Sequence, residues 1–438
     1  MAKKHLIVIG GPTASGKTDW AIRMAQHFQT EILSCDSRQF YREMDIGTAK
    51  PAPEELQEVP HHFISNLSIH DRYSVGDFER EAMKLLDELF QKQDLVILTG
   101  GSGLYIKALC EGLDEFPEVP SPVREEVEQL YQQKGLDALR EELQRADPDY
   151  YAEVDLYNPA RLIRALSVCR TSGRPFSSFR RAGQISRPFT SIYLQLHLPR
   201  QVLYQRINQR VDQMLDQGLE EEAKRLFPHR EQSALQTVGY QEFFDYFEDK
   251  IPQAEAIRLI KRNTRRYAKR QLTWMRRDSH WKHIGPDEWD IALQYIALVR
   301  EQGLCMEQRS GNDPSLAVLL DRYYTFSKLP RSAVCLMEGK RIAGAAPLLG
   351  NRHYHLLVPP VLPEAFQRPG LAELLLHEAI HSTGFSSCFA RVPASIEPFL
   401  HRFGFETVDR VPPNIEEQFP ASPFAGESTV LLFREKIG

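Results

Sequence analysis

A glycine-rich loop near the start of the chain has the residue types needed to hold a phosphate group. The segment GPTASGKT has the spacing of a phosphate-binding loop, and it lies between a short apolar run and a helical pattern. Backbone N–H groups at the start of a helix attract anions, Lys17 adds a positive charge, and the Thr18 hydroxyl can reach a phosphate oxygen or a magnesium ion. The predicted anion site therefore consists of Gly11, Pro12, Thr13, Ala14, Ser15, Gly16, Lys17 and Thr18.

A carboxylate stands at a second position suited to chemistry. Asp36 follows the apolar stretch ILS at 32–34, which places it at the carboxyl edge of a predicted strand. Ligands of α/β sheets bind at that edge, and a carboxylate there can take a proton from an incoming nucleophile. An aspartate in such a loop can also merely cap a helix. Both interpretations of Asp36 stay open on position alone.

The end of the next predicted strand argues against a standard ATPase or kinase. The apolar run at 94–98 ends in Thr99 and Gly100, where many nucleotidases have a magnesium-binding aspartate. We therefore expect the loop to hold the diphosphate of a ligand other than a nucleoside triphosphate.

A long basic segment, RLIKRNTRRYAKRQLTWMRR at 258–277, places its cations at helical spacing. Such a face suits the phosphate backbone of a nucleic acid, although it carries no base specificity by itself. A basic helix is also often just a solvated surface. The cations of this predicted face are Arg258, Lys261, Arg262, Arg265, Arg266, Lys269 and Arg270.

Over about residues 5–300 the sequence resembles the tRNA dimethylallyltransferase family. The segments that carry the resemblance, in the order of the family's motifs, are GPTASGKT at 11–18, CDSRQFY at 35–41, DIGTAKP at 45–51, TGGSGLYIKAL at 99–109, NPARLIRAL at 158–166, TVGYQE at 237–242 and KRQLTWMRR at 269–277. One departure is Cys35, where valine is the more frequent residue in the family; the change is small and leaves Asp36 in place.

The resemblance implies a reaction. Enzymes of this family transfer a five-carbon prenyl group from dimethylallyl diphosphate to N6 of the adenosine that is 3′-adjacent to the anticodon, in tRNAs reading codons that begin with U. Lys17, Thr18 and Arg210 would then stabilise the leaving diphosphate together with Mg²⁺ bound through Thr18, and Asp36 would be the general base. The implied tRNA contacts are Asp36, Ser37, Arg38, Gln39, Ser102, Arg124, Arg161, Arg164, Gly239, Lys269, Arg270, Trp274 and Arg276.

Three alternatives stay open for this region. An adenylate isopentenyltransferase would use the same donor on a free nucleotide, and a small-molecule kinase would use the loop for a triphosphate. A tRNA-binding protein that has lost catalysis would keep the basic face alone. The basic segment and the long helical insertion favour tRNA as the acceptor.

The last part of the chain resembles acetyltransferases of the GNAT superfamily. QRPGLA at 367–372 fits the signature Q/R-x-x-G-x-G/A, a hairpin pattern precedes it, and a helix, a strand and FLHRFGF at 399–405 follow. The resemblance implies acetyl-CoA held by backbone N–H groups, with Gln367, Arg368, Gly370 and Ala372 at the pyrophosphate. Many such enzymes have a tyrosine acid where this sequence has Leu400. Acetyl-CoA binding without turnover, acetylation of an unknown amine, and assistance in tRNA binding therefore all stay open.

A rival pattern overlaps this helix. His377-Glu378-Ala-Ile-His381 is a literal H-E-x-x-H, so two histidines one turn apart could bind zinc with Glu378 as base. A third ligand is required, for which Glu397 or His401 is available. If the two histidines are ordinary helix residues that bind no metal, we expect their side chains to face solvent.

The elements that position these residues form an α/β fold. Strand, loop and helix patterns at 5–28 and 94–109 predict a doubly wound parallel sheet with a phosphate-binding loop, and residues 191–197 resume it. Between them, about 118–187 read as a helical insertion. We expect domains at 1–300 and 316–438, the second an α+β GNAT-like domain with a hairpin turning at Glu338-Gly339, joined by a polar linker at 301–315.

The composition fits a cytoplasmic enzyme. The chain has 438 residues, 42% of them hydrophobic and 26% charged, with a net charge of −5, so nucleic-acid binding must come from a local basic face. The six cysteines are scattered, as in reduced proteins, and the apolar run at the N-terminus is too short for a signal peptide or a membrane span. We expect a monomer in the cytoplasm that does not contact membranes.

Overall fold

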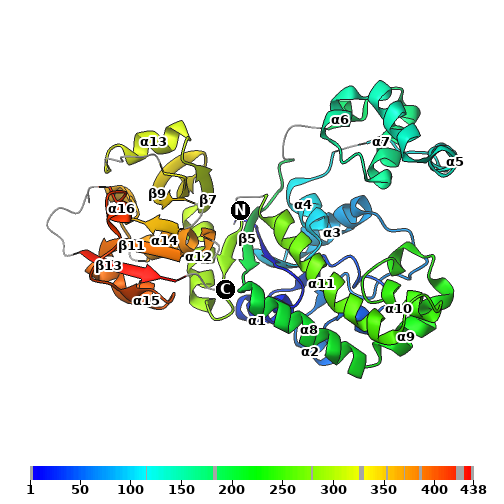
Figure 1. The fold of residues 1–438 in the computed structure, drawn as a ribbon, viewed down its shortest axis with the longest axis horizontal. Helices are drawn as coiled ribbons and strands as arrows, with labels where there is room; N and C mark the ends of the chain where they lie inside the picture. Colours follow the sequence, from blue (N-terminus) through cyan, green and yellow to red (C-terminus); the bar gives the residue numbers. More distant parts are fainter. Residues whose placement is uncertain are drawn as a thin grey trace. The chain divides into compact units, whose positions relative to one another are not determined.

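The computed structural model describes residues 3–114, 116–180, 185–277, 280–324, 330–351, 354–368, 370–383, 387–420 and 429–435. The chain divides into two compact units, which we describe separately. Lys107–Arg187 form a helical unit, and Met1–Ile106 together with Pro188–Gly438 form a larger unit that contains two sheets (Figure 1). No helix in the described part of the chain is both long and apolar enough to cross a bilayer.

The first sheet has six parallel strands in the order β3-β2-β4-β1-β5-β6. Its strands are apolar because helices cover both faces, as in other doubly wound sheets. The carboxyl ends of β1, β2 and β4 meet at one edge, where Ile9 of β1 pairs with Thr99 of β4. The strands are β1 (His5–Gly10), β2 (Ile32–Ser34), β3 (His61–His62), β4 (Leu95–Gly100), β5 (Thr190–Leu196) and β6 (Lys282–Ile284).

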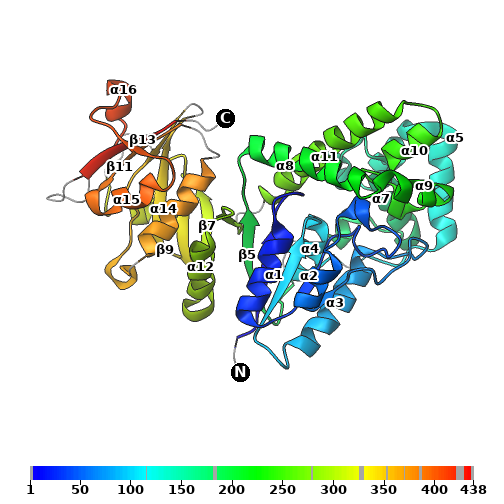
Figure 2. The same cartoon turned by 90° about the horizontal axis from the view of Figure 1, so that it is seen from below.

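The helices of this half bring distant sequence segments to that edge. The long basic segment forms one helix, α11 (Gln253–Met275), and it packs on α8 (Arg200–Asp216) through Leu203, Ile207 and Ala268 (Figure 2). The remaining helices are α1 (Lys17–Phe28), α2 (Pro53–Glu58), α3 (Val75–Leu89), α4 (Gly103–Glu111), α9 (Leu219–Leu226) and α10 (Gln241–Phe247).

The helical unit confirms the predicted insertion and starts earlier than expected, at residue 107. Its helices are α5 (Ser121–Ala146), α6 (Pro148–Glu153) and α7 (Pro159–Ser172). They enclose a core of their own that includes Val127, Leu139 and Leu143 of α5 and Leu162 and Leu166 of α7. Residues 181–184 of the predicted insertion lie outside the described residues.

The second sheet has seven strands in the order β12-β13-β11-β10-β9-β8-β7. Its pairs are antiparallel except β10 with β11, which are parallel because α14 connects them. The predicted order of hairpin, glycine loop, helix, strand and closing helix is present in the tail. Its elements are β7 (Leu304–Ser310), α13 (Pro314–Leu320), β8 (Ser332–Glu338), β9 (Arg341–Gly350), β10 (Tyr354–Leu357), α14 (Leu371–Ser382), β11 (Ser387–Pro393), α15 (Glu397–His401), β12 (Glu406–Thr407), α16 (Pro413–Glu416) and β13 (Thr429–Arg434).

The stretch expected to be a linker at 301–315 is structured. Helix α12 (Trp289–Gln302) ends inside it, and β7 then pairs with β8 along its whole length. Only Leu304 and Met306 of β7 are buried, and its other side chains are polar or half-buried. An edge strand tolerates such polarity, which is why the segment resembled a linker.

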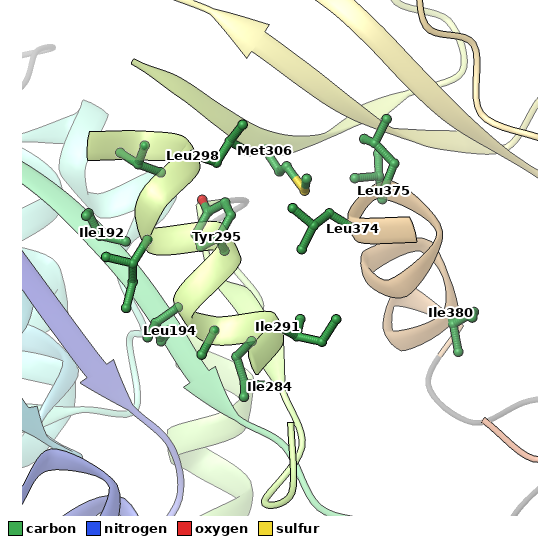
Figure 3. Packing of buried hydrophobic residues seen from close by; sticks show 14 of the residues in the cluster. Ile192, Leu194, Ile284, Ile291, Tyr295, Leu298, Met306, Leu374, Leu375 and Ile380 are labelled. Carbon is green, nitrogen blue, oxygen red and sulfur yellow. The ribbon is translucent and has the colours of Figure 1, made fainter. Parts of the chain in front are cut away.

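Helix α12 joins the two sheets through one hydrophobic cluster. Figure 3 shows Tyr295 of α12 between Ile192 and Leu194 of β5 on one side and Met306 and Leu374 on the other. The tail is therefore packed against the first sheet and is not held by a flexible tether.

Candidate active site

The phosphate-binding loop joins β1 to α1 with a backbone that exposes its N–H groups. Gly16 is the N-cap of α1 with a φ of 92°, a conformation that favours glycine, and no side chain caps the helix there. The first N–H groups of α1 are consequently available to an anion, and the dipole of the helix adds to the attraction.

Cations surround this helix end. Lys17 Nζ donates a hydrogen bond to the carbonyl of Pro12 at 2.9 Å, and Arg210 of α8 donates to the Thr13 hydroxyl at 3.3 Å. Burial lowers the pKa of Lys17 from 10.5 to about 8, while the nearby Asp36 carboxylate opposes that shift. Lys17, Thr18 and Arg210 line a cavity of about 560 Å³ together with Arg206, one turn before Arg210. Two arginines and a lysine in one cavity match a diphosphate better than a neutral ligand.

Asp36 lies in the wall of the same cavity, directly after β2. Its Oδ1 accepts a hydrogen bond from the backbone N–H of Arg38 at 3.1 Å, which fixes the turn. The next N–H, of Ser37, donates to the Ser102 hydroxyl at 3.2 Å, so the loop after β2 is tied to the loop after β4. The carboxylate is thus held at the sheet edge, where its remaining lone pairs can accept a proton.

A second cavity of about 340 Å³ lies on the other side of Asp36. Asp36 and Arg210 line both cavities, so these two side chains stand where the two spaces meet. Tyr267 and Arg270 of α11 belong to the second cavity alone, and burial together with the Asp36 charge raises the pKa of the Tyr267 phenol. We call the first cavity, which contains the phosphate-binding loop and Lys17, the cationic chamber. Basic side chains also line the second cavity, which differs from the first in containing Tyr267.

Gln271 braces the phosphate-binding loop, a role that the sequence did not suggest. Its Oε1 accepts the N–H of Thr13 at 2.9 Å, and its Nε2 donates to the carbonyl of Gly101 at 3.1 Å. Gln271 is buried on α11, and a Cβ on Gly101 would lie 2.1 Å from its Nε2. A neutral amide among the cations of KRQLTWMRR is the one signal that could have identified it.

The segments DIGTAKP at 45–51 and TVGYQE at 237–242 are connected through hydrogen bonds to the buried Glu222. The Glu222 carboxylate accepts the N–H groups of Asp45, Ile46 and Gly47 at 2.9–3.1 Å and the Tyr240 hydroxyl at 2.7 Å. Glu222 is 1% exposed, and its charge together with burial raises the pKa of Tyr240. DIGTAKP and TVGYQE therefore hold one another in place beside the second cavity.

The structure distributes the predicted tRNA contacts unevenly. Ser37, Arg38, Gly239 and Arg270 line the second cavity, and Gln39 lines the first. The Arg38 guanidinium also donates to the carbonyls of Ser233 and Ala234. Lys269 and Arg276 are exposed, Ser102 holds Ser37, and Trp274 packs close to Gly103, whereas Arg124, Arg161 and Arg164 lie in the helical unit.

The basic face of α11 is smaller than the sequence implied. Arg258 pairs with Glu255 at 2.6 Å, Lys261 pairs with Asp212, and Arg265 donates to Asn208 at 2.7 Å. Among the described residues, no carboxylate forms an ion pair with Arg266 or Lys269, and both are exposed. The cations available to a phosphate backbone therefore belong to the second half of the helix.

The glycine loop of the tail also opens onto a cavity. Gly370 has a φ of 80° and is the N-cap of α14, and a cavity of about 470 Å³ lies beside it. Gln367, Arg368 and Ala372 line that cavity, so the structure brings the predicted residues together. Leu400, at the position of the expected acid, is fully buried.

The H-E-x-x-H histidines do not face solvent, which corrects the expectation for ordinary helix residues. His377 is 0% and His381 8% exposed, because α14 packs on the end of the first sheet. Glu397 and His401 pair with each other, and in the described chain neither belongs to a cluster that could hold a metal ion. The carboxylate beside the two histidines is Glu288, which precedes α12.

Known proteins similar to about the first two thirds of this chain belong to one family. A family model described as IPP transferase matches residues 39–278. A tRNA dimethylallyltransferase of Christiangramia forsetii is 51% identical over 284 residues, which make up 65% of this chain and 94% of that protein. The crystal structure of a tRNA isopentenylpyrophosphate transferase from Bacillus halodurans is 36% identical, with a TM-score of 0.51 over 68% of this chain and 98% of that one. A eukaryotic dimethylallyltransferase acting on tRNA is 25% identical, with a TM-score of 0.58 over 68% of this chain and 78% of that one.

Proposed function

The chain belongs to the IPP transferase family, and from that membership we propose that it transfers a dimethylallyl group from dimethylallyl diphosphate to N6 of the adenosine 3′-adjacent to the anticodon of tRNA. The observation that carries the proposal is the position of Asp36 and Arg210, which line both the cationic chamber and the second cavity. Dimethylallyl diphosphate in the first cavity and an adenine in the second would meet at these two side chains.

The cationic chamber suits the donor's diphosphate. When the allylic C–O bond breaks, its electron pair leaves with the diphosphate, so positive groups fixed there in advance lower the barrier. Lys17, Arg210 and the N-terminus of α1 supply that charge. Mg²⁺ fits the same place, because the Thr18 hydroxyl is an oxygen ligand in that cavity, and the ion would neutralise part of the charge on the diphosphate.

The second cavity suits the acceptor base. An adenosine must leave the stack of the anticodon loop to react, at a cost of about a few kcal/mol. In the cavity, its N6 amine attacks the allylic carbon, the new N–C bond forms, and Asp36 takes the proton that the amine releases. Tyr267 and Arg270 line this space and can contact the base from the side of α11.

The tRNA would reach this cavity along the second half of α11. The exposed Arg266 and Lys269 lie on the helix that also carries Tyr267 and Arg270. Phosphate contacts made there would orient the anticodon stem without reading its sequence. The remaining implied contacts on the helical unit, at Arg124, Arg161 and Arg164, belong to the same proposal, as do a cytoplasmic location and a monomeric state.

The tail would bind acetyl-CoA at the cavity beside Gly370. The first N–H groups of α14 point to an anion site like that of α1, and Arg368 adds a charge at its rim. Because Leu400 offers no acid, acetyl transfer by the tail would need another donor to protonate the thiolate of CoA as it departs.

The decisive experiment supplies labelled dimethylallyl diphosphate and Mg²⁺ to the full chain, with tRNA in one reaction and AMP in another. Label in tRNA alone supports the proposal. Label in AMP alone would identify an adenylate isopentenyltransferase, and tRNA binding without transfer would identify a protein that has lost catalysis. A control with labelled ATP and no prenyl donor tests the kinase alternative.

A further inference from the structure

The junction between the two sheets contains a buried cluster of ionisable groups that the transferase chemistry does not use. Glu288 lies just before α12, while His377 and His381 lie one turn apart on α14. His377 Nε2 is 2.7 Å and His381 Nε2 3.5 Å from the same oxygen of Glu288. One ligand atom from each of the three residues lies within 4.8 Å of the others.

We propose that Glu288, His377 and His381 form a structural binding site for a divalent transition metal, and that the ion fastens the tail to the first sheet. Two imidazoles and one carboxylate are a ligand set typical of zinc, whose ligands lie about 2.0–2.2 Å from the ion. Ligand atoms bound that way are about 3.3 Å apart by tetrahedral geometry. The separations from Glu288 lie on either side of that value, so small side-chain rotations would complete the site.

The charges around the cluster favour a cation. Glu288 and Glu378 are two buried or half-buried carboxylates, and Lys282, 1% exposed, is the fully buried cation among them. Lys282 Nζ contacts Glu378 at 3.2 Å and the Nδ1 of His377 at 2.9 Å, so it serves Glu378. Glu288 has the two imidazoles as side-chain partners and accepts the backbone N–H of Gly285 at 2.6 Å, so no cation among the described residues pairs with it. Buried charge is stable when it is compensated, and a metal ion next to Glu288 would provide that compensation.

A cavity beside His381 offers an entry route to the site. His381 also borders a cavity of about 490 Å³, with Ser382, His197 and Gln308 among its other residues. An ion could enter there, and a water molecule in the cavity could be the fourth ligand.

The arrangement does not suit a metalloprotease, although the sequence pattern is the one that zinc proteases use. Glu378, the general base of that pattern, accepts hydrogen bonds from the backbone N–H of His283 at 3.0 Å and from its ring at 2.6 Å, and it pairs with Lys282. A carboxylate held by three donors is a poor proton acceptor. The proposed role is therefore structural.

The test uses the tag-free full chain, stripped with a chelator and then titrated with Co²⁺ and with Zn²⁺. We expect one ion per chain and visible ligand-field absorption of four-coordinate Co²⁺ that Zn²⁺ abolishes. No binding at one equivalent, or a Co²⁺ spectrum typical of six-coordinate hydrated ion, would overturn the proposal, and the cluster would then be a hydrogen-bonded junction only.

Variants assign the ion to these residues. His381→Gln and Glu288→Gln should each weaken binding more than about a hundredfold, because losing a ligand costs more than the 10–100-fold effect of losing an outer partner. His401→Gln, which removes a half-exposed histidine of the same domain, should bind like the wild type. Equal binding in all three variants would place the ion elsewhere and refute the site. If a variant misfolds by circular dichroism, the wild-type cobalt spectrum still decides.

Discussion

The N-termini of helices α1 and α14 have the same backbone conformation but are surrounded by different side chains. Helices α1 and α14 both follow a glycine in the left-handed conformation, Gly16 and Gly370, and neither has a side-chain cap. Each opens onto a cavity, of about 560 and 470 Å³. The backbone arrangement at both ends is that of an anion site.

The side chains around the two helix ends differ. The cavity at α1 has Lys17, Arg206, Arg210 and the Asp36 carboxylate in its wall. The cavity at α14 is lined by prolines and aliphatic residues such as Pro359 and Ile396, and its single arginine, Arg368, also bonds Gln302 at 2.6 Å. The two ends thus share the backbone of an anion site, but only the end at α1 also has a carboxylate and several cations around it.

The largest expected effect comes from removing the base at α1. Asp36→Asn keeps the shape and the turn but cannot take the proton of the amine, so the single-turnover rate of prenyl transfer should fall about 10²–10⁴-fold. Affinity for tRNA should stay within about threefold of the wild type, measured by filter binding; this is less than 1 kcal/mol. An unchanged transfer rate would exclude Asp36 as the base.

Removing a cation from the same chamber should have the next largest effect. Arg210→Gln loses charge opposite the departing diphosphate and should lower the transfer rate about 10²–10³-fold, the usual cost of one such donor. Arg200→Gln, at the exposed start of the same helix, is the matched control. Equal rates in the two variants would mean that Arg210 does not contact the leaving group.

The lowered pKa of Lys17 predicts a pH dependence. The protonated form of Lys17 binds diphosphate, and its pKa in the free protein is about 8. Above pH 8 the affinity for inorganic diphosphate should therefore fall about tenfold per pH unit. Lys17→Arg should remove the trend. The sign for folding is opposite, since the unfolded chain holds more protons above pH 8 and the free energy of unfolding should rise with pH there. Calorimetric titration from pH 7 to 10 measures the binding trend, and a flat profile in the wild type would contradict it.

The exposed half of α11 should govern the salt dependence of tRNA binding. Arg266→Gln with Lys269→Gln removes two cations that lack acidic partners in the described chain, so the slope of log K against log salt should shrink by about 1.4–1.8. Arg258→Gln, whose charge is already paired with Glu255, should change the slope little. If both variants gave the wild-type slope, tRNA would contact another face.

The smallest effect belongs to the tail. Arg368→Gln should weaken acetyl-CoA binding about two- to fivefold, because one partly exposed charge at a helix N-terminus contributes about 0.3–1 kcal/mol. Transfer of the prenyl group should not change, since Arg368 borders only the cavity at α14 among the cavities described. If the wild-type tail binds no acetyl-CoA, the N-terminus of α14 shares the backbone conformation of α1 but not its proposed anion binding.

Much of the fold follows from local patterns. The strand, loop and helix around GPTASGKT, the hairpin turning at Gly339 and the helix after Gly370 are all where the sequence placed them. These features depend on residues a few positions apart, whose spacing and glycine content already specify the backbone. The short strands β6 and β7 were missed because each is polar or too short to stand out.

For the candidate site, the sequence by itself determined which residues have the right chemistry, and the tertiary structure decided which of them meet. Lys17, Asp36 and Arg210 were identifiable from their segments, but the sheet and α8 bring all three into one cavity and place Asp36 and Arg210 in the wall of a second. Gln271 reaches Thr13 across 258 positions, and Glu288 reaches His377 across 89. Contacts at such separations leave no periodic signal in the chain, because they depend on how whole elements pack, and only folding brings those side chains together.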